Sequence, residues 1–156
     1  MNFIFFSFSI ILKNTHIISK PRNCSYFYFY SKISMSKKII FTEKAPAAIG
    51  PYSQAVLAGN TLYVSGQIAL DLAPLGDIKA ETQRIMENLG HILTEAEMDY
   101  TNVVKSSIFL KNMDDFAVVN EVYGSFYPEN PPARETVQVA KLPKDVNVEI
   151  SVIAVK

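Results

Sequence analysis

Cysteine, histidine and tryptophan are scarce in this chain of 156 residues, which holds one cysteine, two histidines and no tryptophan. The single cysteine, Cys24, excludes a disulfide within one chain. From Met35 onward there is no cysteine, and His91 is the only histidine. That segment lacks the ligands of a Cys/His zinc site, and a Cys-His or Ser-His nucleophilic pair would have to use His91. An enzyme built on it would work with carboxylate, guanidinium, hydroxyl and backbone groups, and we expect no metal and no cofactor.

An excess of positive charge is also lacking. The whole chain has a formal net charge of zero, from 15 basic and 15 acidic residues. Residues 1–34 contain no acidic residue, whereas residues 35–156 contain 11 basic and 15 acidic residues. Nucleic-acid-binding surfaces are typically basic. The mildly acidic composition of residues 35–156 therefore predicts that this segment has no nucleic-acid partner.

Residues 1–34 lack an apolar run that is long enough to cross a bilayer, and no basic residue precedes the run at residues 3–12 as a secretory signal requires. We expect no membrane attachment. Three interpretations of residues 1–34 stay open: a leader read in frame before a start at Met35, a mitochondrial targeting segment, or a structural arm. We expect an extension without fixed structure at residues 1–34 and a domain at residues 35–156. The expected location is cytoplasmic, or mitochondrial if the extension is a genuine transit segment.

Hydrophobic periodicity and turn residues predict the order β-β-β-α-β-α-β-β from Met35 onward. The expected strands span residues 37–42, a segment that ends at the Gly59-Asn60 turn, and residues 61–70, 102–111, 135–142 and 146–155. In the strand at residues 61–70, alternation assigns one face to Leu62, Val64 and Ile68 and the other face to Tyr63, Ser65 and Gln67. Residues 71–76 and 127–134 are expected to be loops, the second because it holds three prolines.

Two helices are expected between these strands. The first runs from its N-cap, Asp77, to about Ala96. The second begins after a cap at Asp114 or Asp115. Its apolar stripe consists of Phe116, Val119, Tyr123 and Phe126.

This order implies an α+β domain in which both helices pack on one face of a single sheet. Near the end of the last strand, residues 152–155 are all apolar. Since successive side chains point to opposite faces, both faces of the sheet need a cover there. The two helices can cover only one face. We therefore expect a second copy of the protein on the other face, and hence a homo-oligomer.

Two charged residues near the end of the chain are candidates for chemistry. Arg134 follows Pro131-Pro132, and its guanidinium can bind a carboxylate through two hydrogen bonds. The alternative is a surface arginine paired with a neighbouring glutamate. Glu149 lies on the polar parity of the last strand, where it is either solvated or drawn into a partly desolvated interface between copies.

Smaller features accompany this pair. Tyr52 follows a Gly-Pro corner, and Gly66, after Ser65, allows close approach of a ligand to the backbone or marks a β-bulge. Asn120 falls beside the apolar stripe of the second helix, where its amide needs a partner. His91 is expected to be solvated, because it shares its helix face with acidic residues.

Four motifs resemble a known family, namely "APAAIGPYSQAV", "YVSGQI", "VVKSSIFLKNMDDFAVVNEVY" and "PPARETVQVAKLPKDVNVEI". In this order they are similar to the reactive intermediate (imine/enamine) deaminases. This is the Rid or YjgF family, also labelled endoribonuclease L-PSP, and the chain resembles its archetypal RidA subgroup. The resemblance covers about residues 36–156. It implies a chorismate-mutase-like α+β fold, a homotrimer with clefts between subunits, and hydrolysis of 2-iminopropanoate and 2-iminobutanoate to 2-oxo acids and ammonia.

The resemblance also implies roles for particular residues. The family's "PAR" arginine, which clamps the substrate carboxylate, matches Arg134, and its "VEI" glutamate, which positions or activates water, matches Glu149. The "GPYSQ" tyrosine matches Tyr52 as a further candidate catalytic residue. The matches expected to bind substrate beside Arg134 are Ser65, Gly66, Asn120 and Thr136.

Three positions depart from the family's pattern. Thr136 stands where relatives often carry Cys or Ser, the loop at residues 71–77 is shorter, and Glu97 replaces the glycine that usually ends the first helix. The competing functions are a binding or chaperone-like trimer without catalysis, which the presence of both Arg134 and Glu149 disfavours, and an endoribonuclease or translation inhibitor. The acidic composition and the lack of a catalytic histidine pair give the latter little support.

Overall fold

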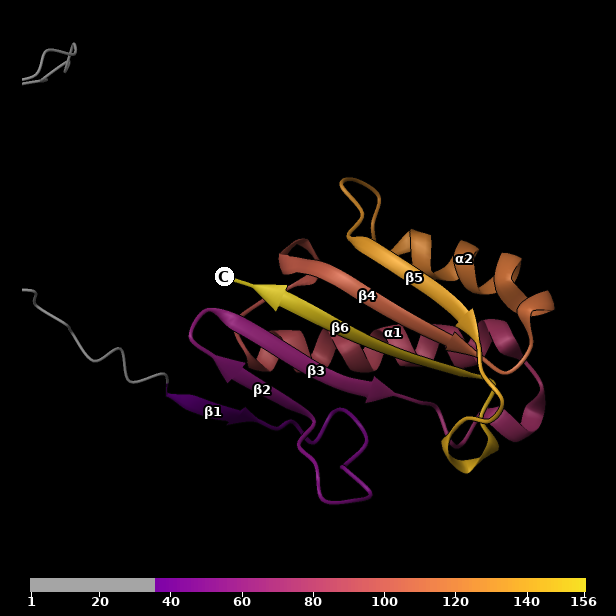
Figure 1. The fold of residues 1–156 in the computed structure, drawn as a ribbon, viewed down its shortest axis with the longest axis horizontal. Coiled ribbons are helices and arrows are strands. Elements are labelled where there is room, and N and C mark those ends of the chain that lie inside the picture. Colours follow the sequence, from indigo (N-terminus) through magenta and orange to yellow (C-terminus); the bar gives the residue numbers. More distant parts are fainter. Residues whose placement is uncertain (1–35) are drawn as a thin grey trace, which may run out of the picture. The chain divides into compact units, whose positions relative to one another are not determined.

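A computed structural model describes residues 36–156, and the expectations for residues 1–34 lie outside this part of the chain. Within it, six strands form one sheet in the order β1-β2-β3-β6-β4-β5 (Figure 1). The strands are β1 (Lys37–Ile40), β2 (Ala55–Ala58), β3 (Thr61–Gln67), β4 (Val103–Leu110), β5 (Ala133–Gln138) and β6 (Val148–Val155). Strands β4 and β5 pair in parallel and the other neighbours are antiparallel, so the sheet is mixed.

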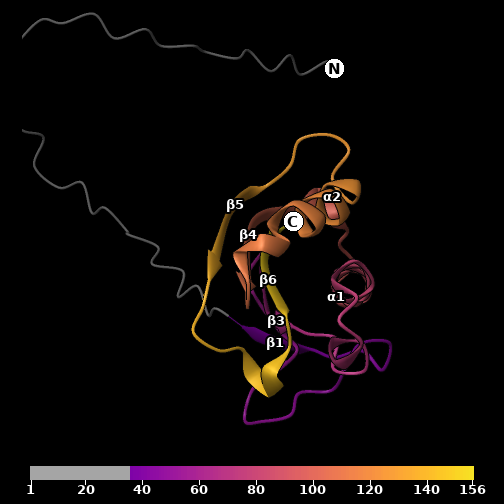
Figure 2. The same ribbon diagram turned by 90° about the vertical axis from the view of Figure 1, so that its right-hand side faces the viewer.

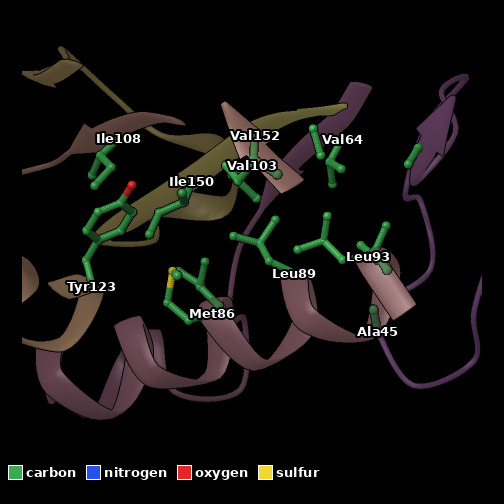
Figure 3. Close-up of a cluster of buried hydrophobic side chains, with 14 of the residues drawn as sticks. Ala45, Val64, Met86, Leu89, Leu93, Val103, Ile108, Tyr123, Ile150 and Val152 are labelled. Carbon is green, nitrogen blue, oxygen red and sulfur yellow. The ribbon is translucent and has the colours of Figure 1, made fainter. Parts of the chain in front are cut away.

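Both helices, α1 (Ile78–Glu95) and α2 (Phe116–Ser125), pack on the same face of this sheet (Figure 2). The predicted element order and the α+β class are therefore confirmed. We call the face that the helices cover the helix face and the opposite one the open face. Side chains from both helices and from the helix face of the sheet form the core (Figure 3), which includes Met86, Leu89, Leu93, Ile108, Tyr123, Ile150 and Val152. In the described part of the chain, neither helix is long and apolar enough to cross a membrane.

Helix α1 begins as the sequence predicts, because the side chain of Asp77 accepts a hydrogen bond from the backbone N–H of Ala80 at 3.0 Å. Helix α2 also begins where the sequence predicts, because its N-cap position is Asp115, but the capping hydrogen bond is formed one turn earlier. A short 3-10 turn, Met113–Asp115, precedes α2, and its N-cap is Asn112, which accepts from the N–H of Asp114 at 3.1 Å. Asp115 makes no capping hydrogen bond through its side chain.

Strand β3 is shorter than predicted, and the side chains after its bulge point to the opposite sheet faces from those predicted. It ends at Gln67 rather than at residue 70, and its pairing with β6 shifts between Val64 and Gln67. A β-bulge adds one residue to a strand, so every side chain after it changes face. Gln67 is consequently buried, whereas Ile68 was predicted to take that side. Within the predicted loop at residues 71–76, Ala73–Leu75 form a short 3-10 helix that ends at Gly76.

Strand β5 begins earlier than predicted. Arg134 was expected in the loop at residues 127–134, but Ala133 and Arg134 already pair with Lys105 and Ser106 of β4. The loop prediction holds through Pro132. Arg134 therefore has a fixed position in the sheet, directly beside Ser106.

The backbone just after α1 offers a test of stability. Glu97 adopts φ 58°, in the left-handed region that favours glycine, as the family's pattern leads one to expect. We expect Glu97→Gly to raise the midpoint of thermal unfolding by about 2 to 4 °C. The control is Glu97→Ala, which also removes the ion pair of Glu97 with Lys156 but keeps a Cβ. Equal midpoints for the two variants in differential scanning calorimetry would contradict this explanation.

Candidate functional site

Glu149 lies on the open face of the sheet. It alternates with the buried Val148 and Ile150, which face the helices, so its predicted parity is correct. Its side chain borders a pocket of about 370 Å³. The pocket is lined by Ile49, Tyr52, Ser65, Gly66, Ile68, Pro143 and Glu149.

The bulge in β3 brings Gly66 directly against Glu149. A Cβ at residue 66 would lie 1.8 Å from Oε1 and 2.6 Å from the carboxyl carbon of Glu149. The interpretation of Gly66 as part of a β-bulge is therefore confirmed, and the group that lies against it is the side chain of Glu149. Close approach of a ligand to its backbone stays a prediction. The adjacent Ser65 donates from its hydroxyl to the carbonyl of Ser53 at 2.7 Å, which ties the bulge to the segment that carries Tyr52.

The contact between Gly66 and Glu149 predicts the effect of one added methyl group. We expect Gly66→Ala to fold, because the side chain of Glu149 can rotate away, but to displace the carboxylate from the pocket. Catalytic turnover that depends on this carboxylate should fall by about 100-fold or more. The matched control is Gly59→Ala on the β2–β3 turn, where no atom lies within 4 Å of the added Cβ. Its positive φ costs stability but leaves the pocket intact. Wild-type turnover by Gly66→Ala would contradict this expectation.

Tyr52 stands at the rim of the pocket and is 49% exposed. Its hydroxyl accepts a hydrogen bond from the N–H of Ile49 at 3.2 Å. The segment that carries both residues is anchored by the buried Gln54. The amide of Gln54 accepts from the N–H of Thr42 at 2.8 Å and donates to the carbonyls of Thr42, Ala45 and Pro46. Sequence reasoning missed Gln54, because its partners lie 8 to 12 residues away in an irregular segment.

Partial burial raises the pKa of Glu149 above its ordinary value, since desolvation penalises the carboxylate. Its strand is fixed two residues earlier by Glu81, which is fully buried in α1. The carboxylate of Glu81 accepts from the N–H groups of Asn147 and Val148 at 2.9 and 3.2 Å, and from the side-chain amide of Asn147 at 2.8 Å. Sequence reasoning also missed Glu81, since its partners are 66 and 67 residues away.

Arg134 has a different environment. Its guanidinium carbon lies 5.0 Å from the centre of the Tyr123 ring and 5.8 Å from that of the Phe116 ring, both on α2. Among residues 36–156, no carboxylate forms a salt bridge with Arg134. Its neighbour Glu135 instead contacts Lys105 and Ser107. The alternative of an arginine paired with a neighbouring glutamate is therefore wrong.

Two further predicted site residues share the helix face with Arg134. Thr136 is paired with Ile108, a core residue, and its hydroxyl is buried without a hydrogen-bond partner in the described part of the chain. Asn120 is exposed on α2, and the helical spacing places it between Phe116 and Tyr123. His91 is exposed on α1, as expected for a solvated histidine.

The predicted site residues thus form two groups on opposite faces of one sheet. Arg134 pairs with Ser106, and Ser106 pairs with Val152, so all three point to the helix face. Glu149 is three residues from Val152 along a strand whose pairing with β4 is regular between them, so it points to the open face. Within one chain, Arg134 cannot reach the pocket beside Glu149. The structure brings Tyr52, Ser65 and Gly66 to Glu149, and Asn120 and Thr136 to the side of Arg134.

The fold and this site define a single-sheet α+β protein with a carboxylate pocket on one sheet face and, on the other, an arginine that forms no salt bridge within residues 36–156. The family model described as Endoribonuclease L-PSP matches residues 42–156. The chain therefore belongs to this family, which is the Rid or YjgF family that its motifs resemble.

Named relatives support the same assignment. The rat protein named 2-iminobutanoate/2-iminopropanoate deaminase is 49% identical over 128 residues, which cover 79% of this chain and 93% of the rat protein. The crystal structure of RidA from an Antarctic Psychrobacter is 43% identical, with a TM-score of 0.71 over 76% of this chain and 99% of that one. E. coli TdcF with bound serine is 39% identical, with a TM-score of 0.70 over 76% of this chain and 98% of that one. Other relatives are named RutC family proteins.

Proposed function

We propose that this protein hydrolyses 2-imino acids, such as 2-iminopropanoate and 2-iminobutanoate, to 2-oxo acids and ammonia, in clefts between the subunits of a homotrimer. The observation that carries the proposal is the division of the site between the two faces of the sheet. A partly desolvated carboxylate is present together with a guanidinium that has no salt-bridge partner in the described part of the chain, but in one chain the two point in opposite directions. A neighbouring subunit that brings its Arg134 to the Glu149 pocket completes the site.

Exposed apolar side chains support this assembly. Ile39 of β1, Tyr63 of β3 and Val137 of β5 lie on the open face and are 49%, 51% and 40% exposed in the single chain. A patch of this kind favours association with another protein surface. We therefore propose that a second copy of the protein covers the open face.

The groups around the pocket suit the hydrolysis of an imine. A protonated imine is already electrophilic, so water can add to its carbon without a covalent nucleophile. In the proposed reaction, Glu149 holds the attacking water and accepts its proton as the C–O bond forms. Glu149 then returns this proton to the nitrogen. As the C–N bond breaks and ammonia leaves, the new hydroxyl gives its proton to Glu149 and becomes the carbonyl of the 2-oxo acid. Arg134 of the neighbouring subunit orients the substrate through its carboxylate. Tyr52 and the backbone N–H of Gly66 border the reacting atoms.

The walls of the pocket also fit the substrate class. Ile49, Ile68 and Pro143 give it apolar walls that accept a short alkyl side chain. On the other side of the cleft, we assign the binding of polar groups of the substrate to Thr136 and Asn120. The name of the rat relative and the serine bound to TdcF agree with a small ligand that carries a carboxylate and a nitrogen on the adjacent carbon.

A coupled assay tests this function. An amino-acid dehydratase or oxidase generates the 2-imino acid in solution, and the release of the 2-oxo acid is followed with and without the purified protein. We expect the protein to accelerate this release. No acceleration by a folded oligomer would contradict the proposal and would favour the binding or chaperone-like function. Salt-dependent RNA binding by a nuclease-free preparation would favour the endoribonuclease instead.

A further inference from the structure

The side chain of Arg134 is held by aromatic rings instead of an acidic partner. Its guanidinium carbon lies 5.0 Å from the centre of the Tyr123 ring and 5.8 Å from that of the Phe116 ring. The two rings differ in exposure, because Tyr123 is 3% exposed and Phe116 is 39% exposed. Arg134 therefore lies beside one ring that belongs to the core and one ring that is partly exposed at the surface.

The buried ring is fixed by the same residue that positions the backbone of Arg134. The hydroxyl of Tyr123 donates to the hydroxyl oxygen of Ser106 at 2.9 Å, and Ser106 is fully buried. Ser106 is also the residue of β4 that pairs with Arg134 of β5. The Tyr123 ring also packs against Tyr127, with 4.8 Å between ring centres. Ser106 therefore connects the backbone position of Arg134 to the position of the ring over which its guanidinium lies.

Such an arrangement matters because an arginine side chain is long and loses considerable rotamer freedom when a ligand fixes it. A cation over an aromatic face is stabilised by the quadrupole of the ring, more strongly where it is shielded from water. A contact with aromatic rings forms no N–H···O hydrogen bond, so it leaves the N–H groups of the guanidinium available to a carboxylate. An acidic partner would position the side chain equally well, but it would occupy those N–H groups.

From this geometry we infer that Phe116 and Tyr123 are positioning residues, which hold the guanidinium of Arg134 ready for the carboxylate of the substrate. The inference rests on the proposed function, in which Arg134 is the carboxylate clamp. It adds two residues of α2 that none of the sequence motifs assigned to the site. Because they act through Arg134, their loss affects the binding of the carboxylate and leaves the addition of water unchanged.

The test compares variants of the full chain in the coupled assay and in calorimetric binding of 2-oxobutanoate, the carboxylate product. We expect Phe116→Leu and Tyr123→Leu to raise KM and the product Kd by about 3- to 10-fold, with kcat within about twofold of wild type. Phe116→Tyr keeps the ring and should retain wild-type KM. Tyr123→Phe keeps the ring but loses the hydrogen bond to Ser106, so its KM should lie between those of wild type and Tyr123→Leu. Phe126→Leu is the control, because Phe126 is an aromatic residue just after α2 that packs on Tyr100 and does not contact Arg134.

Binding of 2-oxobutanamide, the neutral amide of the same acid, separates positioning from general damage to the fold. We expect the two Leu variants to lose affinity for the acid and not for the amide. Equal loss for both compounds, or KM values that match those of Phe126→Leu, would overturn the inference.

The control for the proposed function is Arg134→Ala. If that variant is fully active, the clamp itself is wrong, whereas a large loss in Arg134→Ala beside unaffected Leu variants removes only the role of the rings.

Discussion

Replacement of Arg134 by alanine is expected to lower kcat/KM for 2-imino acids by about 30- to 900-fold, which corresponds to about 2 to 4 kcal/mol of transition-state stabilisation. The reason is that no other residue on the helix face of β5 offers a charged fork to the substrate carboxylate. Most of the loss should appear in KM, because the interaction with the carboxylate already exists in the bound substrate. Steady-state kinetics in the coupled assay measure both constants.

Two variants give this prediction its controls. Arg134→Lys keeps the charge but not the planar fork, so it should fall between wild type and Arg134→Ala. Arg84→Ala removes an arginine of α1 that forms salt bridges with Asp71 and Glu87 at 3.0 and 3.7 Å, and it should retain wild-type kinetics. Wild-type kcat/KM in Arg134→Ala would exclude the clamp.

Replacement of Glu149 by glutamine is expected to lower kcat by about 100- to 10,000-fold, with KM changed little. Glutamine has nearly the same shape and can contact a water, but it cannot accept a proton from it. The matched control is Glu135→Gln on the neighbouring region of the open face, because the Glu135 carboxylate is already bound by Lys105 and Ser107. A Glu149→Gln variant with wild-type kcat would show that the carboxylate is not the base.

The pH dependence of the wild-type reaction provides a second check on Glu149. Burial raises the pKa of its carboxyl group, so the protonated, inactive form persists to a higher pH than for an ordinary glutamate. Activity should therefore fall as the pH decreases through this raised pKa and increase as the carboxylate forms. In Glu149→Gln the residual activity should lack this acidic limb. An acidic limb that survives in the variant would assign the titration to another group.

Local patterns predicted most of the fold, because alternation and helical periodicity report directly on which side chains are buried. They failed where the backbone departs from regularity. In the sequence of β3, the alternation of Leu62, Val64 and Ile68 shows no break at the bulge. In the structure, the bulge moves Gln67 to the buried side. The bulge is needed where Glu149 approaches Gly66, and this contact joins residues 83 positions apart in the sequence.

The site was predicted as a set of residues but not as an arrangement. The parity of β6 correctly placed Glu149 away from the core. The sheet face to which Arg134 points could not be predicted in the same way. It depends on the register between β5 and β4, which are parallel and joined through α2. Buried polar anchors such as Gln54 and Glu81 were also missed, since a polar residue within a loop or helix is usually exposed and only its distant partners explain its burial.

The central claim is that each site takes Arg134 from one subunit and Glu149 from another, and mixed trimers test it most directly. Arg134→Ala and Glu149→Gln chains are coexpressed with different affinity tags, and only trimers that carry both tags are purified and assayed. Any such trimer contains one interface with an intact Arg134 facing an intact Glu149, so we predict about one third of the wild-type activity. Each parent variant alone should remain nearly inactive. Mixed trimers no more active than their parents would contradict a site shared between subunits.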